Sequence, residues 1–205
     1  MDYYAHTYGE DQSQWQPLRE HLENVAKLAE KFAREARPGD EAFAYAAYTA
    51  GLLHDLGKYR PEFQEYIDPR HQREASTDTH HAVYGAATAL HSDAIRAAFA
   101  VAGHHSGLHD LSELDALVQK SRYSAQTVFP GLVMRAQGEI ASWQNPLGDC
   151  EPVADREKLK FEFSTRVLFS LLVDADRLDT ARAERKALRL PLQPSPTALD
   201  AATLA

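Results

Sequence analysis

Two adjacent pairs of ionisable residues, His54-Asp55 and His104-His105, lie among small and apolar residues in the segments LLHDLGK and VAGHHSGL. Placing imidazole and carboxylate groups in such surroundings costs free energy unless a partner satisfies them. Imidazole nitrogens together with carboxylate oxygens suit a divalent transition metal. The two pairs therefore predict a metal site. Asp55 has two oxygens, so its carboxylate could bridge two ions where a histidine could not.

Two more histidines lie at helical spacing from residues that would face a protein interior. His21 is followed by apolar residues four, seven and eleven positions later, and His81 by small residues four and seven positions later. Residues at these spacings share one face of a helix. Alone, His21 is better explained as a hydrogen-bonded core histidine than as a ligand. The ordered set of histidines and aspartates along one chain favours the metal site.

An acidic residue near the C-terminus would add negative charge to such a site. Asp176, within LFSLLVDADRLDT, follows apolar residues three, four and seven positions earlier, so we expect it on an inward helix face. A lone buried carboxylate would cost several kcal/mol or become protonated. A metal ion, or a salt bridge to Arg166 or Arg177, would relieve that cost. Asp174, two residues earlier, stays open as the alternative ligand.

The elements that must position these residues are predicted to be helices. Apolar residues recur at helical spacing along most of the chain, and clear alternating strand patterns are scarce. Pro17 is expected in the first turn of the first helix, and Gly57 is expected to end the second. The fold class is therefore all-α. The expected helices cover residues 17 to the break at Pro38-Gly39, 41–56, a short segment from Pro61, 80–90, 92–103, 110–118, 133–143 and 157–188, with loops over 68–79 and 145–155.

Length and charge set limits on the class of protein. The 205 residues fit one domain, predicted over residues 1–189, followed by a proline-rich tail or linker over 190–205. A net charge of −8 argues against a general nucleic-acid coat protein, but a nuclease remains open because bound metal ions add positive charge. Cys150 is the only cysteine, so no internal disulfide can form. With no leader and no long apolar run, we expect a cytoplasmic protein without a membrane partner.

Several motifs together resemble a known family. The chain carries HLEN from His21 to Asn24, then LLHDLGK, HHAVYGA, GHHSGL and DADRLDT, preceded by the lead WQPLREHLENVAKLAEKFA. This set resembles the HD nuclease domain of type I CRISPR interference over residues 1–189. In that family the domain is usually fused to a superfamily 2 helicase and sometimes stands alone. The resemblance implies a helical bundle with a buried di-metal site.

The resemblance also implies roles for individual residues. Asp55 would bridge two ions, Lys58 would contact the substrate phosphate or assist catalysis, and Thr180 would lie near the scissile phosphate. Histidine-rich ligation favours Fe, Mn, Co or Ni over Mg. The implied ligands are His21, His54, Asp55 and Asp176 for one ion, and Asp55, His81, His104 and His105 for the other.

Three functions follow from these residues. The first is a metal-dependent nuclease that hydrolyses phosphodiester bonds of single-stranded DNA during CRISPR interference, with a superfamily 2 helicase and a guide-RNA effector complex as partners. The second is a nucleotide phosphohydrolase of the HD superfamily that acts on dNTPs or cyclic nucleotides. The third is a non-catalytic, metal-binding docking module of an effector complex. The choice between endonuclease and exonuclease stays open.

Two further groups of residues lie outside the ligand set. Tyr59, Arg60, Phe63 and Tyr66 could form a track that stacks on bases beside the site, although packing of an amphipathic helix on the core explains them better. The remaining histidines are expected on surface loops, and these include His6, His71, His91 and His109.

Overall fold

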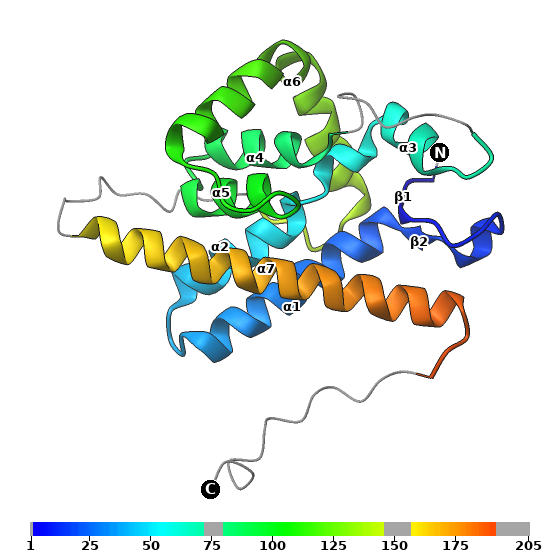
Figure 1. Ribbon diagram of the computed structural model, residues 1–205, viewed down its shortest axis with the longest axis horizontal. Helices are drawn as coiled ribbons and strands as arrows, with labels where there is room; N and C mark the ends of the chain where they lie inside the picture. The colour runs from blue at the N-terminus through cyan, green and yellow to red at the C-terminus, as the bar shows by residue number, and fades with distance from the viewer. Residues whose placement is uncertain (1, 72–79, 146–156, 192–205) are drawn as a thin grey trace, which may run out of the picture.

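The computed structural model describes residues 2–71, 80–145 and 157–191, and helices make up most of them (Figure 1). In the described part of the chain, the strands β1 (Tyr4–His6) and β2 (Gln16–Pro17) form one small antiparallel pair. The all-α prediction is confirmed. Cys150 and residues 192–205 of the predicted tail lie outside the described residues, as do 72–79 of the first predicted loop and 146–155 of the second.

Most helices follow the predicted segments. A short 3-10 turn, η1 (Gln12–Gln14), separates the two strands, and a second 3-10 turn, η2 (Leu56–Tyr59), follows the second helix. The α-helices are α1 (Leu18–Ala36), α2 (Glu41–Leu53), α3 (Pro61–Ile67), α4 (Ala82–His91), α5 (Ile95–Gly103), α6 (Leu111–Glu139) and α7 (Lys158–Ala187).

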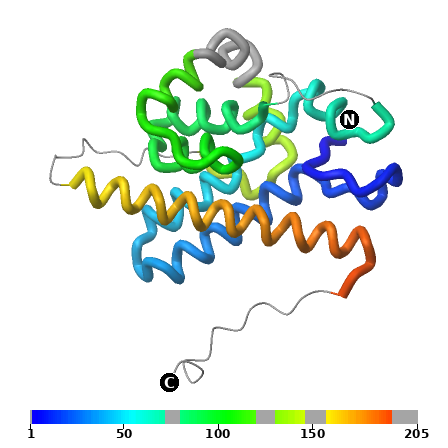
Figure 2. The backbone as a smooth tube through the Cα atoms, viewed as in Figure 1, coloured from blue at the N-terminus to red at the C-terminus, as the bar shows by residue number. Residues whose placement is uncertain are grey.

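The helices α1, α2 and α7 pack against one another, and α5 lies on α2 and α7 (Figure 2). Leu18, Leu22, Val25 and Ala29 of α1 are fully buried at helical spacing, and so is His21, whereas the charged residues of α1 are exposed or half-buried. The helix α2 is buried almost all round, as its run of alanine, tyrosine and leucine predicts. These contacts place the core among α1, α2, α5 and α7.

Two boundary predictions are wrong. The second helix ends at Leu53, and Gly57 lies inside η2, where a side chain would collide with the backbone of His81. The predicted helices 110–118 and 133–143 belong to one helix, α6, which passes through Pro130 and ends at Glu139. A proline removes one helical hydrogen bond and usually breaks a helix, so local pattern alone favoured two segments.

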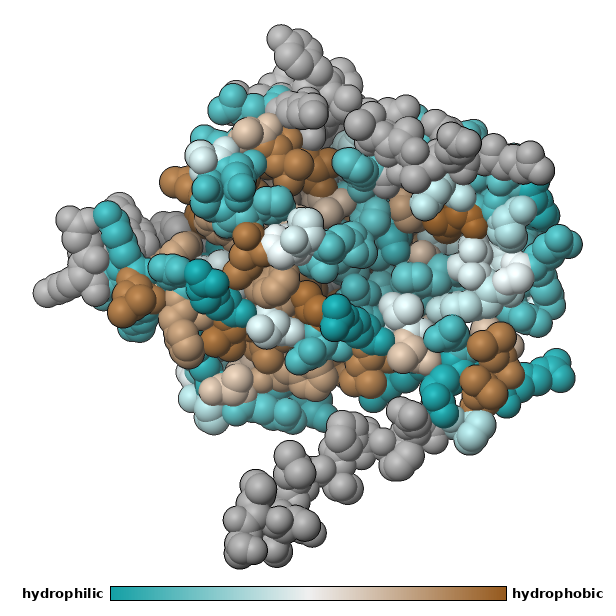
Figure 3. All heavy atoms as spheres, viewed as in Figure 1, coloured by the Kyte–Doolittle hydropathy of each residue, from teal (hydrophilic) through white to brown (hydrophobic). Residues whose placement is uncertain are grey.

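The visible face of α7 carries hydrophobic and hydrophilic side chains mixed together (Figure 3). Phe163, near the start of this helix, is 61% exposed. Among the described residues, no helix combines the length and the apolar character that crossing a membrane requires.

Candidate metal centre

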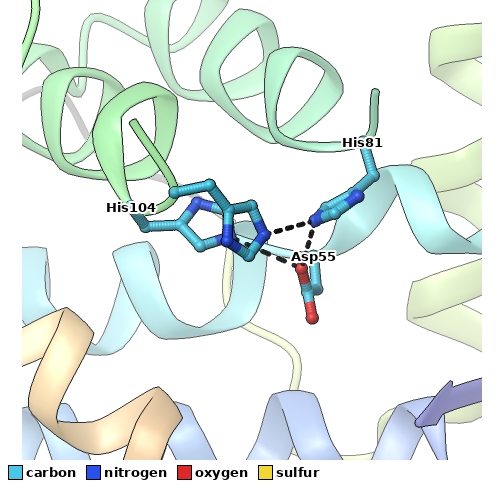
Figure 4. Close-up of side chains that lie close together, drawn as sticks. Asp55, His81 and His104 are labelled. Carbon is cyan, nitrogen blue, oxygen red and sulfur yellow. Dashed lines mark hydrogen bonds and ion pairs between the residues drawn. The ribbon is translucent and has the colours of Figure 1, made fainter. Parts of the chain in front are cut away.

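Five helices bring the seven predicted ligands to one place. His21 lies in the first turn of α1 and Asp176 in the second half of α7, whereas the other five residues lie at or just beyond helix ends. Figure 4 shows Asp55, His81 and His104 pointing toward one another from three separate elements. The helix-end residues are His54 and Asp55 after α2, His81 before α4, and His104 and His105 after α5.

The carboxylate of Asp55 faces two groups of histidines, one with each oxygen. Its Oδ2 lies 3.3 Å from Nε2 of both His21 and His54. Its Oδ1 lies 3.0 Å from Nε2 of His81 and 3.6 Å from Nε2 of His104 (Figure 4). A carboxylate placed in this way can serve two neighbouring metal positions at once.

Asp176, rather than Asp174, faces the cluster. Oδ1 of Asp176 lies 3.4 Å from Nε2 of His21 and 3.7 Å from Nε2 of His54. Asp174 is exposed on the other side of α7. Arg166, which could have paired with Asp176, forms its ion pair with Glu162. The first group of possible ligand atoms is therefore His21, His54 and Asp176, with Asp55 beside them.

The second group reaches the surface. His81 Nε2 lies 2.8 Å from Nε2 of the exposed His105, and the rings of His104 and His105 are 3.9 Å apart. Together with Asp55 these three histidines form a second cluster of atoms close enough to hold one ion. Because His21 and His54 are fully buried, the centre has a closed inner side and an open outer side.

The amino-acid sequence matches one known protein family. A sequence profile described as the HD domain matches residues 18–137, which is more than half of the chain. The chain belongs to the HD domain family. HD domains bind divalent metals and are usually metal-dependent phosphohydrolases. The matched range of this HD domain includes His21, the His54-Asp55 pair and the His104-His105 pair, but it ends before Asp176. No curated protein matches the chain in sequence.

Two histidines of this HD domain are oriented by backbone carbonyls. Nδ1 of His54 donates to the carbonyl of Gly51 at 2.8 Å, and Nδ1 of His104 donates to the carbonyl of Val101 at 2.7 Å. Each carbonyl lies three residues earlier, at the C-terminal end of the same helix. These hydrogen bonds fix the tautomer and leave Nε2 free for a metal ion.

His21 is oriented by a carboxylate that our sequence reasoning missed. Its Nδ1 donates to Oδ2 of Asp179 at 2.8 Å, and Asp179 is buried. The same carboxylate accepts hydrogen bonds from Gln16 at 2.6 Å and from Asn24 at 2.9 Å. A sequence signal did exist, because Asn24 and Asp179 each lie three residues after a predicted ligand, on the same helix face.

Lys58 is buried against the centre. Its Nζ lies 2.7 Å from Oδ2 of Asp55 and donates to the backbone carbonyl of Ala5 at 3.1 Å. The ammonium group therefore compensates the charge of Asp55 and ties the N-terminal strand β1 to the centre.

His6 is a correction to the surface position expected for it. Its side chain is half-buried, and its ring packs edge-on against the ring of His21, with centroids 5.0 Å apart. Nε2 of His6 lies 3.2 Å from Oγ1 of Thr180, and the Thr180 hydroxyl donates to Oδ1 of Asp176 at 3.4 Å. His6 also lies within reach of a metal ion held by His21 and Asp55. No local pattern around His6 indicated this.

Most residues of the suggested stacking track belong to the protein interior. Tyr59, Arg60 and Phe63 are buried, which agrees with the packing explanation. Tyr66 differs, because 37% of it is exposed.

Carboxylates dominate the electrostatics of the inner side. Burial favours neutral imidazole, but the hydrogen bonds that His21 donates to Asp176, Asp179 and Asp55 outweigh it and raise the pKa of His21 to about 10. Burial also lowers the pKa of His54, but the negative charges of Asp55 and Asp176 outweigh this effect and raise that pKa to about 9. Without a metal ion, protons on these two histidines therefore balance the aspartates.

On the outer side of the centre, the pKa values of the histidines are lowered instead of raised. Burial, opposed by Asp55, lowers the pKa of His81, and burial with the neighbouring His104 lowers the pKa of His105 to about 4. These imidazoles are neutral at pH 7 and so are ready to bind a cation.

The residues present fit divalent transition-metal ions. Nitrogen and carboxylate donors converge from both sides of Asp55, and both types of donor bind such ions. Nε2 of His104 is buried and has no hydrogen-bond partner among the residues that the structure describes. A buried polar atom without a partner costs free energy, which a bound ion would relieve.

Proposed function

We propose that this HD domain is a metal-dependent nuclease that hydrolyses phosphodiester bonds of single-stranded DNA. The observation that carries the proposal is the one-sided exposure of the centre. His21 and His54 are closed off, whereas the side chains of His81 and Asp176 are 13% and 18% exposed and His105 is exposed. A polynucleotide can lie across such an edge and present one phosphate to it without entering a closed pocket.

The centre would hold two ions, which share Asp55 and use the two histidine groups as their remaining ligands. Two divalent ions supply an activated water and neutralise the charge of the phosphate. Asp55 and Asp176 leave part of the ionic charge uncompensated, so that a phosphate is attracted. We assign the ions as Fe, Mn, Co or Ni, because most ligands are imidazoles.

In this proposal Lys58 and Thr180 support the chemistry of the centre. Lys58 holds Oδ2 of Asp55 in an ion pair of 2.7 Å, so the carboxylate keeps both oxygens in place. The hydroxyl of Thr180 lies beside Asp176 and could turn its one hydrogen from that carboxylate to a phosphate oxygen.

The choice of single-stranded DNA, and of CRISPR interference as the process, rests on the motifs GHHSGL and DADRLDT and their order after LLHDLGK. In this proposal a guide-RNA effector complex opens the target duplex and a superfamily 2 helicase, in the same chain or a separate one, delivers the strand. Residues 1–189 would form the nuclease and the residues after them a linker toward the helicase.

The test is cleavage of circular single-stranded DNA by metal-stripped protein to which Mn, Ni, Co, Fe or Mg is added one at a time. We expect nicking that depends on the added ion and that Asp55→Ala abolishes while the helical circular-dichroism spectrum is kept. Asp174→Ala is the matched control, because it removes an exposed carboxylate close to the centre, and it should cleave normally.

Two results would overturn the nuclease. Hydrolysis of dNTPs or cyclic nucleotides without cleavage of DNA would identify a nucleotide phosphohydrolase. Tight binding of ions without hydrolysis of either substrate would identify a docking module.

A further inference from the structure

A cavity of about 450 Å³ lies next to the metal centre. Side chains from the end of β1, the end of α3 and the second half of α7 line it, and the surrounding surface over the N-terminal strands is hydrophilic to neutral (Figure 3). Its volume falls in the range of roughly 300–1,000 Å³ that is typical of small-molecule sites. The residues that line the cavity include His6, Thr7, Tyr8, Tyr66, Thr180 and Glu184.

The cavity adjoins the metal centre. His6 and Thr180 line it, and each touches a residue of the metal cluster. His6 packs on the ring of His21, and Thr180 donates to Asp176. A group seated in the cavity therefore lies directly beside a phosphate placed on the open edge.

Hydrogen bonds from the N-terminal segment hold the walls in position. Oγ1 of Thr7 donates to the carbonyl of Ile67 at 2.9 Å, which joins this segment to α3. The hydroxyl of Tyr8 donates to the carbonyl of Thr180 at 3.3 Å, which joins it to α7. The cavity is thus formed before a ligand binds, which lowers the entropic cost of binding.

The chemistry of the lining selects against phosphate and for an aromatic group. Among the described residues that line the cavity, none is a lysine or an arginine, and Glu184 is acidic. A phosphate would be repelled here, whereas a neutral ring with N–H donors could give a hydrogen bond to Glu184. Tyr66 adds an accessible aromatic face, because 37% of it is exposed. Stacking of a base on such a face is favourable whatever the base.

We propose that this cavity is a nucleoside subsite, which holds the sugar and base of the nucleotide adjacent to the scissile phosphate. The base stacks on Tyr66, and His6 and Thr180 separate it from the metal centre. This inference rests on the proposed nuclease function and adds to it a specific place for one unpaired nucleotide. A base in a duplex is stacked and paired, so the subsite also explains a requirement for single strands.

The test compares two substrates of the metal-loaded protein. One is single-stranded DNA, and the other is an abasic strand of the same length, whose phosphodiester bonds carry no bases. Tyr66→Ala should raise the KM for DNA roughly tenfold, within the range that loss of one stacked base gives. Its KM for the abasic strand should not change. Tyr66→Phe keeps the ring and should restore the KM for DNA.

Phe163→Ala is the control for loss of an exposed ring, because Phe163 lies near the start of α7 and does not line the cavity. An unchanged KM for DNA in Tyr66→Ala overturns the subsite, and so does equal loss on both substrates. If the wild-type protein hydrolyses neither substrate, the nuclease proposal fails. The subsite is then tested by the fluorescence anisotropy of a labelled five-nucleotide strand, and a Kd that Tyr66→Ala leaves unchanged overturns it.

Discussion

Asp179 shows how one residue outside the ligand set can control the centre. Its carboxylate holds Nδ1 of His21 at 2.8 Å and is itself held by Asn24 and Gln16. A carboxylate behind a histidine fixes the ring and makes Nε2 a stronger ligand. Asp179 is therefore a positioning residue for the inner metal position.

We expect Asp179→Ala to weaken binding of the inner ion about 10- to 100-fold, which is the usual effect of removing such a partner. Isothermal titration of metal-free protein with Mn²⁺ measures it. Asp174→Ala is the matched control on the same helix, because its carboxylate is exposed. Equal affinity in wild-type protein and Asp179→Ala would show that His21 needs no such support.

The raised pKa values of His21 and His54 predict that metal binding releases protons. These values, about 10 and about 9, lie above pH 7, so in the metal-free protein the pair of rings holds protons in excess of the one that a neutral imidazole carries on Nδ1. A metal ion must displace those protons, because only neutral imidazole binds it. Affinity for Mn²⁺ should therefore rise as the pH increases from 7 toward 9.

Calorimetric titrations in two buffers with different ionisation enthalpies measure the number of protons released. We expect between one and two per inner ion at pH 7. An affinity that does not depend on pH over this range would contradict the assignment of these two histidines as ligands.

At the residue scale, the sequence predicted those site residues whose neighbours along the chain already set them apart. Asp55 and His104 drew attention because charged groups stood inside apolar segments, and the structure buries both. His6 and Asp179 were missed because their partners come from distant segments, β1 against α1 and α7 against α1. The short strand pair that carries His6 to the centre has too few residues to show alternation.

At the scale of elements, close approach of α4 to the end of α2 sets the distance between the two histidine groups. Gly85 of α4 faces the backbone carbonyl of Leu53, and a Cβ at Gly85 would overlap that oxygen. Leu53 immediately precedes His54, and Gly85 lies one turn after His81. A glycine is thus required for His81 to reach Asp55.

We expect Gly85→Ala to lower the melting temperature by about 2–10 °C, because overpacking of a core contact costs about 1–3 kcal/mol. It should also weaken metal binding, since His81 moves away from Asp55. Gly138→Ala is the control, because a Cβ there meets nothing within 4 Å, and alanine favours the helix. Thermal unfolding followed by circular dichroism compares the two, and equal melting temperatures would refute this role of Gly85.

Helices were predictable as elements because each buries an apolar stripe, as α1 does with Leu22 and Val25. The residues at which the helices end were harder to predict. The end of α2 depends on η2 and on contact of Gly57 with the His81 backbone, which no local pattern contains. The continuity of α6 through Pro130 depends likewise on packing rather than on propensity.

For the whole molecule, the net charge of −8 opposes binding of DNA. Bound ions reverse that charge locally at the centre. We therefore expect Mn²⁺ to lower the Kd for single-stranded DNA by about tenfold or more at constant ionic strength. Fluorescence anisotropy at low temperature measures it, with Asp55→Ala as the control that should lose the effect. Equal Kd values with and without Mn²⁺ would place the DNA site elsewhere.

The most direct measurement is the anomalous scattering of crystals grown with Mn²⁺. We expect two peaks about 3.5–4 Å apart, one on each side of the carboxylate of Asp55. One should touch His21, His54 and Asp176, and the other His81, His104 and His105. A single peak, or peaks that do not touch Asp55, would contradict a centre of two ions bridged by this residue.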